Sequence, residues 1–115
     1  MFQFKKSTPP PSEARGAVRY PVYLRTFYAL DGANGPQTGE CDIYDISSTG
    51  VRFHCGRDLS PGTEVVLLLK QGTSLRKMVA AVMWHGHFTE HKYGARFVQP
   101  DAGWESFFRG IVGAN

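Results

Sequence analysis

Two arginines spaced four residues apart, Arg15 and Arg19, could bind an anion near the N-terminus. A guanidinium stays charged at physiological pH and offers five donors in a planar fork, which fits a phosphate or the O6 and N7 edge of guanine. Gly16 makes a turn accessible, and a turn would bring the two forks together. A solvated pair of surface arginines is the alternative interpretation, because this spacing occurs in proteins of many kinds.

A second polar segment, Asp45 to Gly50 with the sequence DISSTG, could act as a turn or as part of a binding site. As a turn, Asp45 and Ser47 would bond neighbouring backbone amides and Gly50 would adopt a positive φ. As a binding site, the carboxylate and the hydroxyl would accept hydrogen bonds from the N1 and N2 donors of a guanine. Both interpretations place the segment between two strands.

The elements that would position these residues are short strands separated by turns. Six segments alternate apolar with polar residues, or stay apolar for a strand length, and turn-forming residues bound them. We predict strands at Tyr20–Ala29, Cys41–Ile46, Val51–Cys55, Glu64–Lys70, Leu75–Gly86 and Lys92–Val98, with a loop over Asp31–Gly39. This spacing favours an all-β fold, either an antiparallel barrel or a sandwich.

The C-terminal segment has a different pattern. Trp104, Phe107, Phe108 and Ile111 fall at the spacing of one helical face, and Asp101 can cap the segment. A short helix is therefore expected to cover one end of the barrel.

The composition fits a single domain. With 115 residues, of which 42% are hydrophobic, the chain can bury one core but not two. Residues 1–14 include three consecutive prolines and show no periodicity, so they are expected to be a flexible leader before a domain at residues 15–115. Residues 1–25 hold five basic residues and one acidic residue, a net charge of +4 in a chain whose total is +3. Such a basic arm suits an anionic partner, or is a solvated tail.

Several classes of function lack support in the sequence. No apolar run is long enough for a membrane span or a signal peptide, which predicts a cytoplasmic chain without membrane insertion. Cys41 and Cys55 are then expected to be reduced thiols. His85, His87 and His91 do not complete a zinc-binding pattern, so no metal or cofactor is expected. No nucleophile elbow, Walker loop or dinucleotide-binding fingerprint is present, and the chain is not expected to be an enzyme.

Taken together, the two polar segments resemble those of the PilZ family of cyclic di-GMP receptors. The family's RxxxR and DxSxxG patterns match Arg15 to Arg19 and Asp45 to Gly50, in that order, in a six-stranded β-domain. The similarity also includes Tyr20-Pro21-Val22, Gly50-Val51-Arg52-Phe53, the turn at Leu59 to Gly62, and Tyr93-Gly94-Ala95-Arg96-Phe97. The resemblance implies a six-stranded antiparallel PilZ-like β-barrel with a short C-terminal helix and a flexible basic N-terminal arm.

The resemblance also implies a function, that of a non-enzymatic receptor for cyclic di-GMP. It assigns phosphates and guanine Hoogsteen edges to Arg15 and Arg19, and the pocket of one guanine to Asp45, Ser47 and Gly50. Binding would reposition the N-terminal arm and change its affinity for an unidentified downstream protein. The process controlled in this way, among motility, secretion, pili and the exopolysaccharide of biofilms, is left open.

Two further residues are candidates for the binding site. Trp84 ends a strand whose family counterpart often contributes a residue beside the base, and it could stack there or belong to the core. Arg96 lies on the opposite strand face from Ala95 and Phe97, where it could face either a ligand or solvent. Ala14 stands where many members of the family have a further arginine, which leaves open whether one nucleotide or a stacked pair binds.

Two alternatives are compatible with the same fold class. One is a PilZ-like protein-interaction module, as found in type IV pilus biogenesis, which does not bind nucleotide and usually lacks the motif residues present here. The other is a small barrel that binds single-stranded nucleic acid by aromatic stacking and a basic groove. Its basic residues should run across the barrel face, whereas here they gather in the arm, so no DNA or RNA partner is expected.

Overall fold

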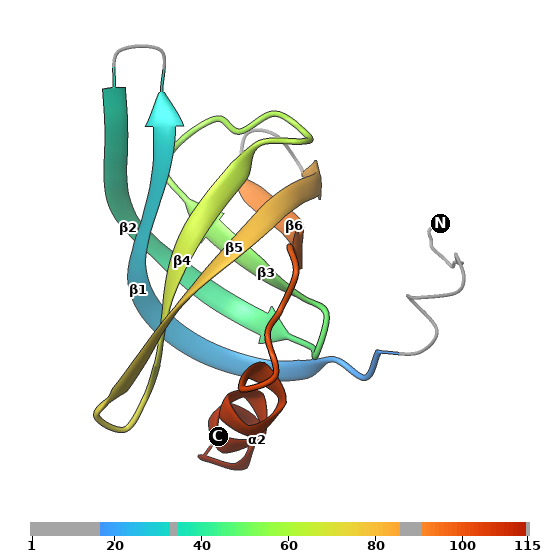
Figure 1. Ribbon diagram of the computed structural model, residues 1–115. Coiled ribbons are helices and arrows are strands. Elements are labelled where there is room, and N and C mark those ends of the chain that lie inside the picture. The colour runs from blue at the N-terminus through green and yellow to red at the C-terminus, as the bar shows by residue number, and fades with distance from the viewer. Residues whose placement is uncertain (1–16, 33–34, 86–90, 115) are drawn as a thin grey trace.

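Six antiparallel strands form a closed barrel with a helix at one end (Figure 1). The computed structural model describes residues 17–32, 35–85 and 91–114, so the expected leader and Arg15 lie outside the described residues. Around the barrel the strands follow the order β1-β2-β3-β6-β5-β4. Their bounds are β1 Tyr20–Gly32, β2 Gly35–Ile46, β3 Gly50–Cys55, β4 Glu64–Gln71, β5 Ser74–His85 and β6 Lys92–Phe97, and the helix is α2, Trp104–Ala114. The predicted six-stranded barrel with a C-terminal helix is confirmed.

The β1–β2 hairpin is longer than the sequence predicts. The expected loop at Asp31–Gly39 is wrong, because Asp31 pairs with Pro36 and Tyr28 pairs with Gly39. A Cβ at Gly39 would lie 2.7 Å from the Tyr28 hydroxyl oxygen, so the missing side chain makes room for the ring. Cross-strand pairing, with an aromatic ring covering the glycine, therefore overrides the turn-forming composition of this segment.

The core lies inside the barrel and follows the alternation of each strand. In β3, Val51, Phe53 and Cys55 are buried, whereas Arg52 and His54 are only half-buried. The inward residues of the other strands include Ile43, Ile46, Val65, Leu67, Leu69, Met78, Ala80, Val82, Tyr93 and Phe97. Tight packing of these side chains fixes which face of each strand is left for binding.

A bulge in β2 turns Asp45 away from this core. The pairing of β2 with β3 shifts register between Ile43 and Asp45, so Tyr44 is one extra residue on β2. With strict alternation from Ile43, Asp45 would point inward. The bulge instead keeps Asp45 half-buried on the outside and buries Ile46.

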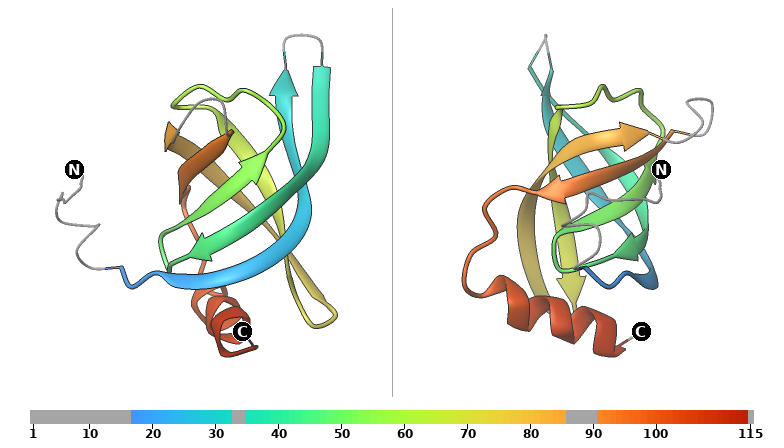
Figure 2. Two further views of the ribbon diagram at one scale, coloured as in Figure 1. Left: turned by 180° about the vertical axis from the view of Figure 1, so that it is seen from behind. Right: turned by 90° about the vertical axis from the view of Figure 1, so that its right-hand side faces the viewer.

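The helix α2 lies across the end of the barrel opposite the tip of the β1–β2 hairpin (Figure 2). Asp101 Oδ1 accepts a hydrogen bond from the backbone N of Gly103 at 3.0 Å, as expected of a residue that caps the helix. The Trp104 ring lies edge-on to Phe97 of β6, with centroids 4.7 Å apart, and Phe108 lies edge-on to Tyr20 of β1 at 5.9 Å. The apolar face predicted from the helical spacing thus contacts β6 and the start of β1.

Candidate functional site

The structure brings the second arginine of the RxxxR pair to the first residue of the DxSxxG segment. Arg19 immediately precedes β1, and the next two residues, Tyr20 and Pro21, pair with Ile46 and Asp45 of β2. This register places Arg19 Nε 3.2 Å from Asp45 Oδ1. Two motifs far apart in the sequence therefore meet on one hairpin.

Asp45 has a second cationic partner that the sequence did not single out. Arg52, directly opposite Asp45 in β3, donates from Nη1 to Asp45 Oδ2 at 3.1 Å. The Asp45 side chain is 15% exposed, against 32% for Arg19 and 39% for Arg52. The carboxylate is thus held between two guanidinium groups that stay accessible from outside. Outward alternation in β3 was visible in the sequence, but the pairing with Asp45 depends on the Tyr44 bulge.

Ser47 forms the turn between β2 and β3. Its Oγ accepts hydrogen bonds from the backbone N of Thr49 at 3.2 Å and of Gly50 at 3.1 Å, and its own N donates to Gly50 O at 2.8 Å. The residue is fully buried. This is the turn interpretation of the segment, and it fixes the backbone next to Asp45.

Gly50 is required for a close approach of strands and not for a positive φ, which corrects the expectation from the sequence. The described glycines with a positive φ are Gly35, Gly62 and Gly72, and Gly50 does not have one. A Cβ at Gly50 would collide with the carbonyl oxygen of Ala95 in β6. On the same side of the turn, Phe97 N donates to Thr49 O at 2.9 Å. The turn is therefore clamped against β6.

The two further candidates, Arg96 and Trp84, lie on neighbouring strands, β6 and β5. Arg96 is exposed on β6 and pairs with Gly50, so it lies beside the DxSxxG turn. The Trp84 backbone pairs with Gly94 in β6 after a register shift beyond Val82. That shift interrupts the alternation from which an inward position would be inferred.

The turn is also tied to the C-terminal helix. Trp104 Nε1 donates a hydrogen bond to the carbonyl oxygen of Ser48 at 2.7 Å. The sequence predicts that Trp104 is buried on the helix, and it is, but the partner of its polar atom could not be read from helical spacing.

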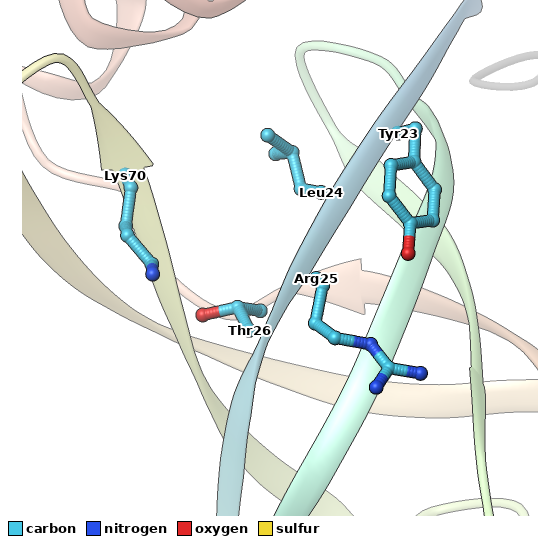
Figure 3. A pocket seen from close by; sticks show the side chains of 5 residues that line it. All are labelled: Tyr23, Leu24, Arg25, Thr26 and Lys70. Atoms are coloured by element: carbon cyan, nitrogen blue, oxygen red, sulfur yellow. The ribbon is translucent and has the colours of Figure 1, made fainter.

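Two surface hollows, each of about 210 Å³, lie away from Arg19 and Asp45. One is lined by side chains of β1 and β4, and Figure 3 shows Lys70 and Thr26 on one side of β1 and Arg25 on the other. Arg25 Nε lies 2.8 Å from Asp42 Oδ1, and this hydrogen bond lowers the pKa of the Asp42 carboxyl below its ordinary value. The charge of Arg25 is therefore already compensated.

The described part of the chain shows neither a metal-binding cluster nor a membrane-spanning helix. Within residues 17–32, 35–85 and 91–114, no three His, Cys, Asp or Glu side chains gather as a metal site would require. No described helix has the length and apolar character needed to cross a membrane.

Comparisons with known proteins agree on one family. A family model described as the PilZ domain matches residues 13–110. Among solved structures, the PilZ domain of CeSA from a cellulose-synthesizing bacterium has a TM-score of 0.59 at 16% identity, covering 84% of this chain and 97% of that one. The PilZ domain of YcgR from Escherichia coli, solved with c-di-GMP, has a TM-score of 0.64 at 15% identity, covering 85% of this chain and 88% of that one.

A third structure is longer than the chain. The inhibitor of motility MotI/DgrA from Bacillus subtilis has a TM-score of 0.61 at 16% identity, covering 92% of this chain and 55% of that one. No curated protein matches the sequence. Since the family model spans both polar segments and most of the barrel, the chain belongs to the PilZ domain family.

Proposed function

We propose that this protein is a receptor for cyclic di-GMP. The observation that carries the proposal is the contact of Arg19 with Asp45, which unites the two segments that the family resemblance assigns to the nucleotide. Membership of the PilZ family, whose domains are binding and regulatory modules, supports the same function. The structure of the YcgR domain with c-di-GMP shows that ligand on the same fold in that protein.

The residues around Asp45 have the chemistry that a guanine nucleotide needs. An arginine fork can donate to guanine O6 and N7 or to a phosphate, and a carboxylate can accept from guanine N1 and N2. Arg19 and Asp45 form an ion pair in which Asp45 Oδ1 accepts no hydrogen bond, so ligand groups would replace one charged contact with others of the same kind. Arg15 would supply the second fork.

Ser47 and Gly50 would act through the backbone rather than by direct contact. The Ser47 hydroxyl already accepts two backbone hydrogen bonds inside the turn. The Gly50 position admits no side chain against β6. Both residues would hold Asp45 at the edge of the nucleotide, which makes them positioning residues.

The signal would leave the protein through its N-terminal segment and a partner protein. Residues 1–19 carry Arg15 and Arg19, so nucleotide binding would reposition this segment on the barrel. A partner that binds the repositioned segment would then respond to the nucleotide concentration.

Calorimetric titration of cyclic di-GMP into the wild type and the Arg15→Ala/Arg19→Ala variant tests the proposal. Arg109→Ala is a matched control, because Arg109 is an exposed arginine on α2 that pairs only with its helical neighbour Glu105 in the contacts described here. Cyclic di-AMP tests selectivity for guanine. We expect saturable binding in the wild type and the control, no binding in the double variant, and no binding of the adenine analogue.

Three other results would contradict parts of this proposal. A folded wild type that does not bind would overturn the receptor function and favour an interaction module without nucleotide. Unchanged affinity in the double variant would overturn the assignment of the site. A steep loss of affinity with salt for single-stranded oligonucleotides, together with no binding of cyclic di-GMP, would favour the nucleic-acid alternative.

A further inference from the structure

The outer face of β1, β4 and β5 carries several apolar side chains, some half-buried and some exposed. These three strands lie side by side around the barrel (Figure 1). Their pairing places Ala29, Val66 and Val79 in one row, and Val98 extends the row by donating from its N to Val79 O at 2.8 Å. These residues alternate with the buried core residues, so they point outward.

The next row of this face is more exposed. Phe27 and Leu68 lie one position beyond the Tyr28–Leu67 pair, and Leu68 pairs with Lys77. Phe27 is 51% exposed, which is unusual for so large an apolar side chain on a strand. The two adjacent rows thus form an apolar surface that Lys77 bounds on β5, and such a surface marks an interaction site more often than a chance cluster.

The charges at the two ends of this surface have opposite signs. Along the outer side of β4 the order is Glu64, Val66, Leu68 and Lys70, acidic at one end and basic at the other. Asp31 lies beside Glu64, because both line the hollow that also contains Ala29, Val66 and Val79. Arg96 pairs with Ala81 from β6, so it lies one strand beyond this acidic pair and outside the β1–β4–β5 face.

At the other end, the described outward residues of β4 and β5 include lysines and no acidic residue. Lys70 lines the second hollow with Thr26 and Leu24, and Lys77 lies beside Leu68 one strand away. Arg25 at this end is turned toward β2, where Asp42 and Glu40 compensate its charge. Lys70 therefore defines the basic end, and Lys77 lies one row closer to the apolar centre, beside Leu68.

From this pattern we propose that the β1–β4–β5 face is a docking surface for a second copy of the same chain. The order acidic, apolar, apolar, basic along β4 is self-complementary when the strand is reversed. A two-fold axis that lies between the two facing sheets, parallel to them and perpendicular to β4, places the second β4 in the reversed direction. Such an interface brings residue i of one copy onto residue j of the other, and j onto i.

In this arrangement the two ends of β4 are complementary in charge, whereas on β5 Lys77 of one copy faces Val79 of the other, along which its apolar stem can lie. Glu64 of one copy faces Lys70 of the other, and Val66 faces Leu68. On β1, Phe27 faces Ala29 of the second copy, so a large side chain meets a small one next to the hollow of about 210 Å³. Matching of large with small residues across facing sheets is how sheet packing fills space.

Charge reversal tests this interface by sedimentation equilibrium of the full chain without nucleotide. In Glu64→Lys two lysines face each other at each end, and in Lys70→Glu two carboxylates do. Each substitution acts twice because of the symmetry, so we expect each to weaken the dimer by roughly tenfold. The double variant Glu64→Lys/Lys70→Glu restores opposite charges at both ends and should dimerise as the wild type does.

Matched controls separate this interface from effects of net charge. Glu105→Lys and Arg109→Glu change the charge of the chain by the same amounts on exposed positions of α2, and they should leave the dimer unchanged. A monomeric wild type up to its solubility limit would overturn the proposal. So would a dimer that the single substitutions do not weaken, or one that the double variant does not restore.

Discussion

The indole Nε1 of Trp104 and the carbonyl oxygen of Ser48 lie 2.7 Å apart, which fastens the C-terminal helix to the turn that carries the DxSxxG residues. Trp104 is almost fully buried, and its ring also contacts Phe97 of β6. The helix, the turn and β6 therefore form one packed unit beside Asp45.

Replacing this indole by a phenyl ring should lower the stability of the fold. Trp104→Phe keeps an aromatic ring but leaves the Ser48 carbonyl oxygen without its donor. An unpaired polar group of this kind costs about 1–3 kcal/mol, so the urea midpoint should fall accordingly. An unchanged midpoint would mean that water replaces the indole at no cost.

Gly50→Ala should destabilise the protein whether or not nucleotide is present. The new methyl group would collide with the Ala95 carbonyl oxygen, and overpacking of this kind costs about 1–3 kcal/mol in the free energy of unfolding. Gly56→Ala is the matched control, because a Cβ at Gly56 meets nothing within 4 Å. Urea unfolding of both variants measures the difference. Equal stability of the two would show that β3 and β6 can separate freely at this point.

Asp45→Ala should affect binding far more than stability. Its ion pairs with Arg19 and Arg52 involve partly exposed arginines, and such pairs contribute about 0–1 kcal/mol. Loss of a base-edge contact costs about 1–3 kcal/mol, so affinity for cyclic di-GMP should fall about tenfold or more. Titration of both cyclic dinucleotides should also show weaker preference for guanine over adenine. If stability falls as steeply as binding, the role of Asp45 is structural.

The stability of the protein should decline in alkaline solution because of its buried thiols. Burial and the nearby Cys55 raise the pKa of Cys41 to about 12, against an ordinary value of about 8.5. The unfolded chain therefore releases this proton first as the pH rises, and the free energy of unfolding falls from about pH 8.5 upward until the folded thiol also ionises. Burial raises the pKa of Tyr93 as well, which adds to the decline above about pH 10.

Urea unfolding at increasing pH tests this prediction. The control is Cys41→Ala, in which the pH slope is compared rather than the absolute stability, because the lost sulfur also leaves a cavity. A shallower slope in the variant is expected. An equal slope in both would show that Cys41 does not stay protonated in the folded state.

Alternation and turn composition were sufficient to predict the six strands, the buried residues of β3 and the helix with its cap, but not the order of the strands around the barrel. They failed at Asp31–Gly39, where pairing of Tyr28 with Gly39 outweighs the local preference for a turn. Local propensity cannot report such long-range pairing, because it depends on residues in another strand.

The candidate site was predictable only in part for a related reason. The DxSxxG residues are recognisable from their spacing, but Arg52 becomes a partner of Asp45 through the register shift at Tyr44. A bulge adds one residue to one strand, and only the break in alternation between Ile43 and Ile46 hints at it in the sequence.

The way in which the barrel closes bears on the order of folding. The hydroxyl of Thr26 bonds the carbonyl oxygen of Leu68, 42 residues away in the chain, beside the pairs that join β1 to β4. Contacts across so long a loop form late, because the entropy of closing the loop must be overcome first. Arg19 and Asp45 instead share the β1–β2 hairpin, so their contact can form during synthesis before the barrel has closed.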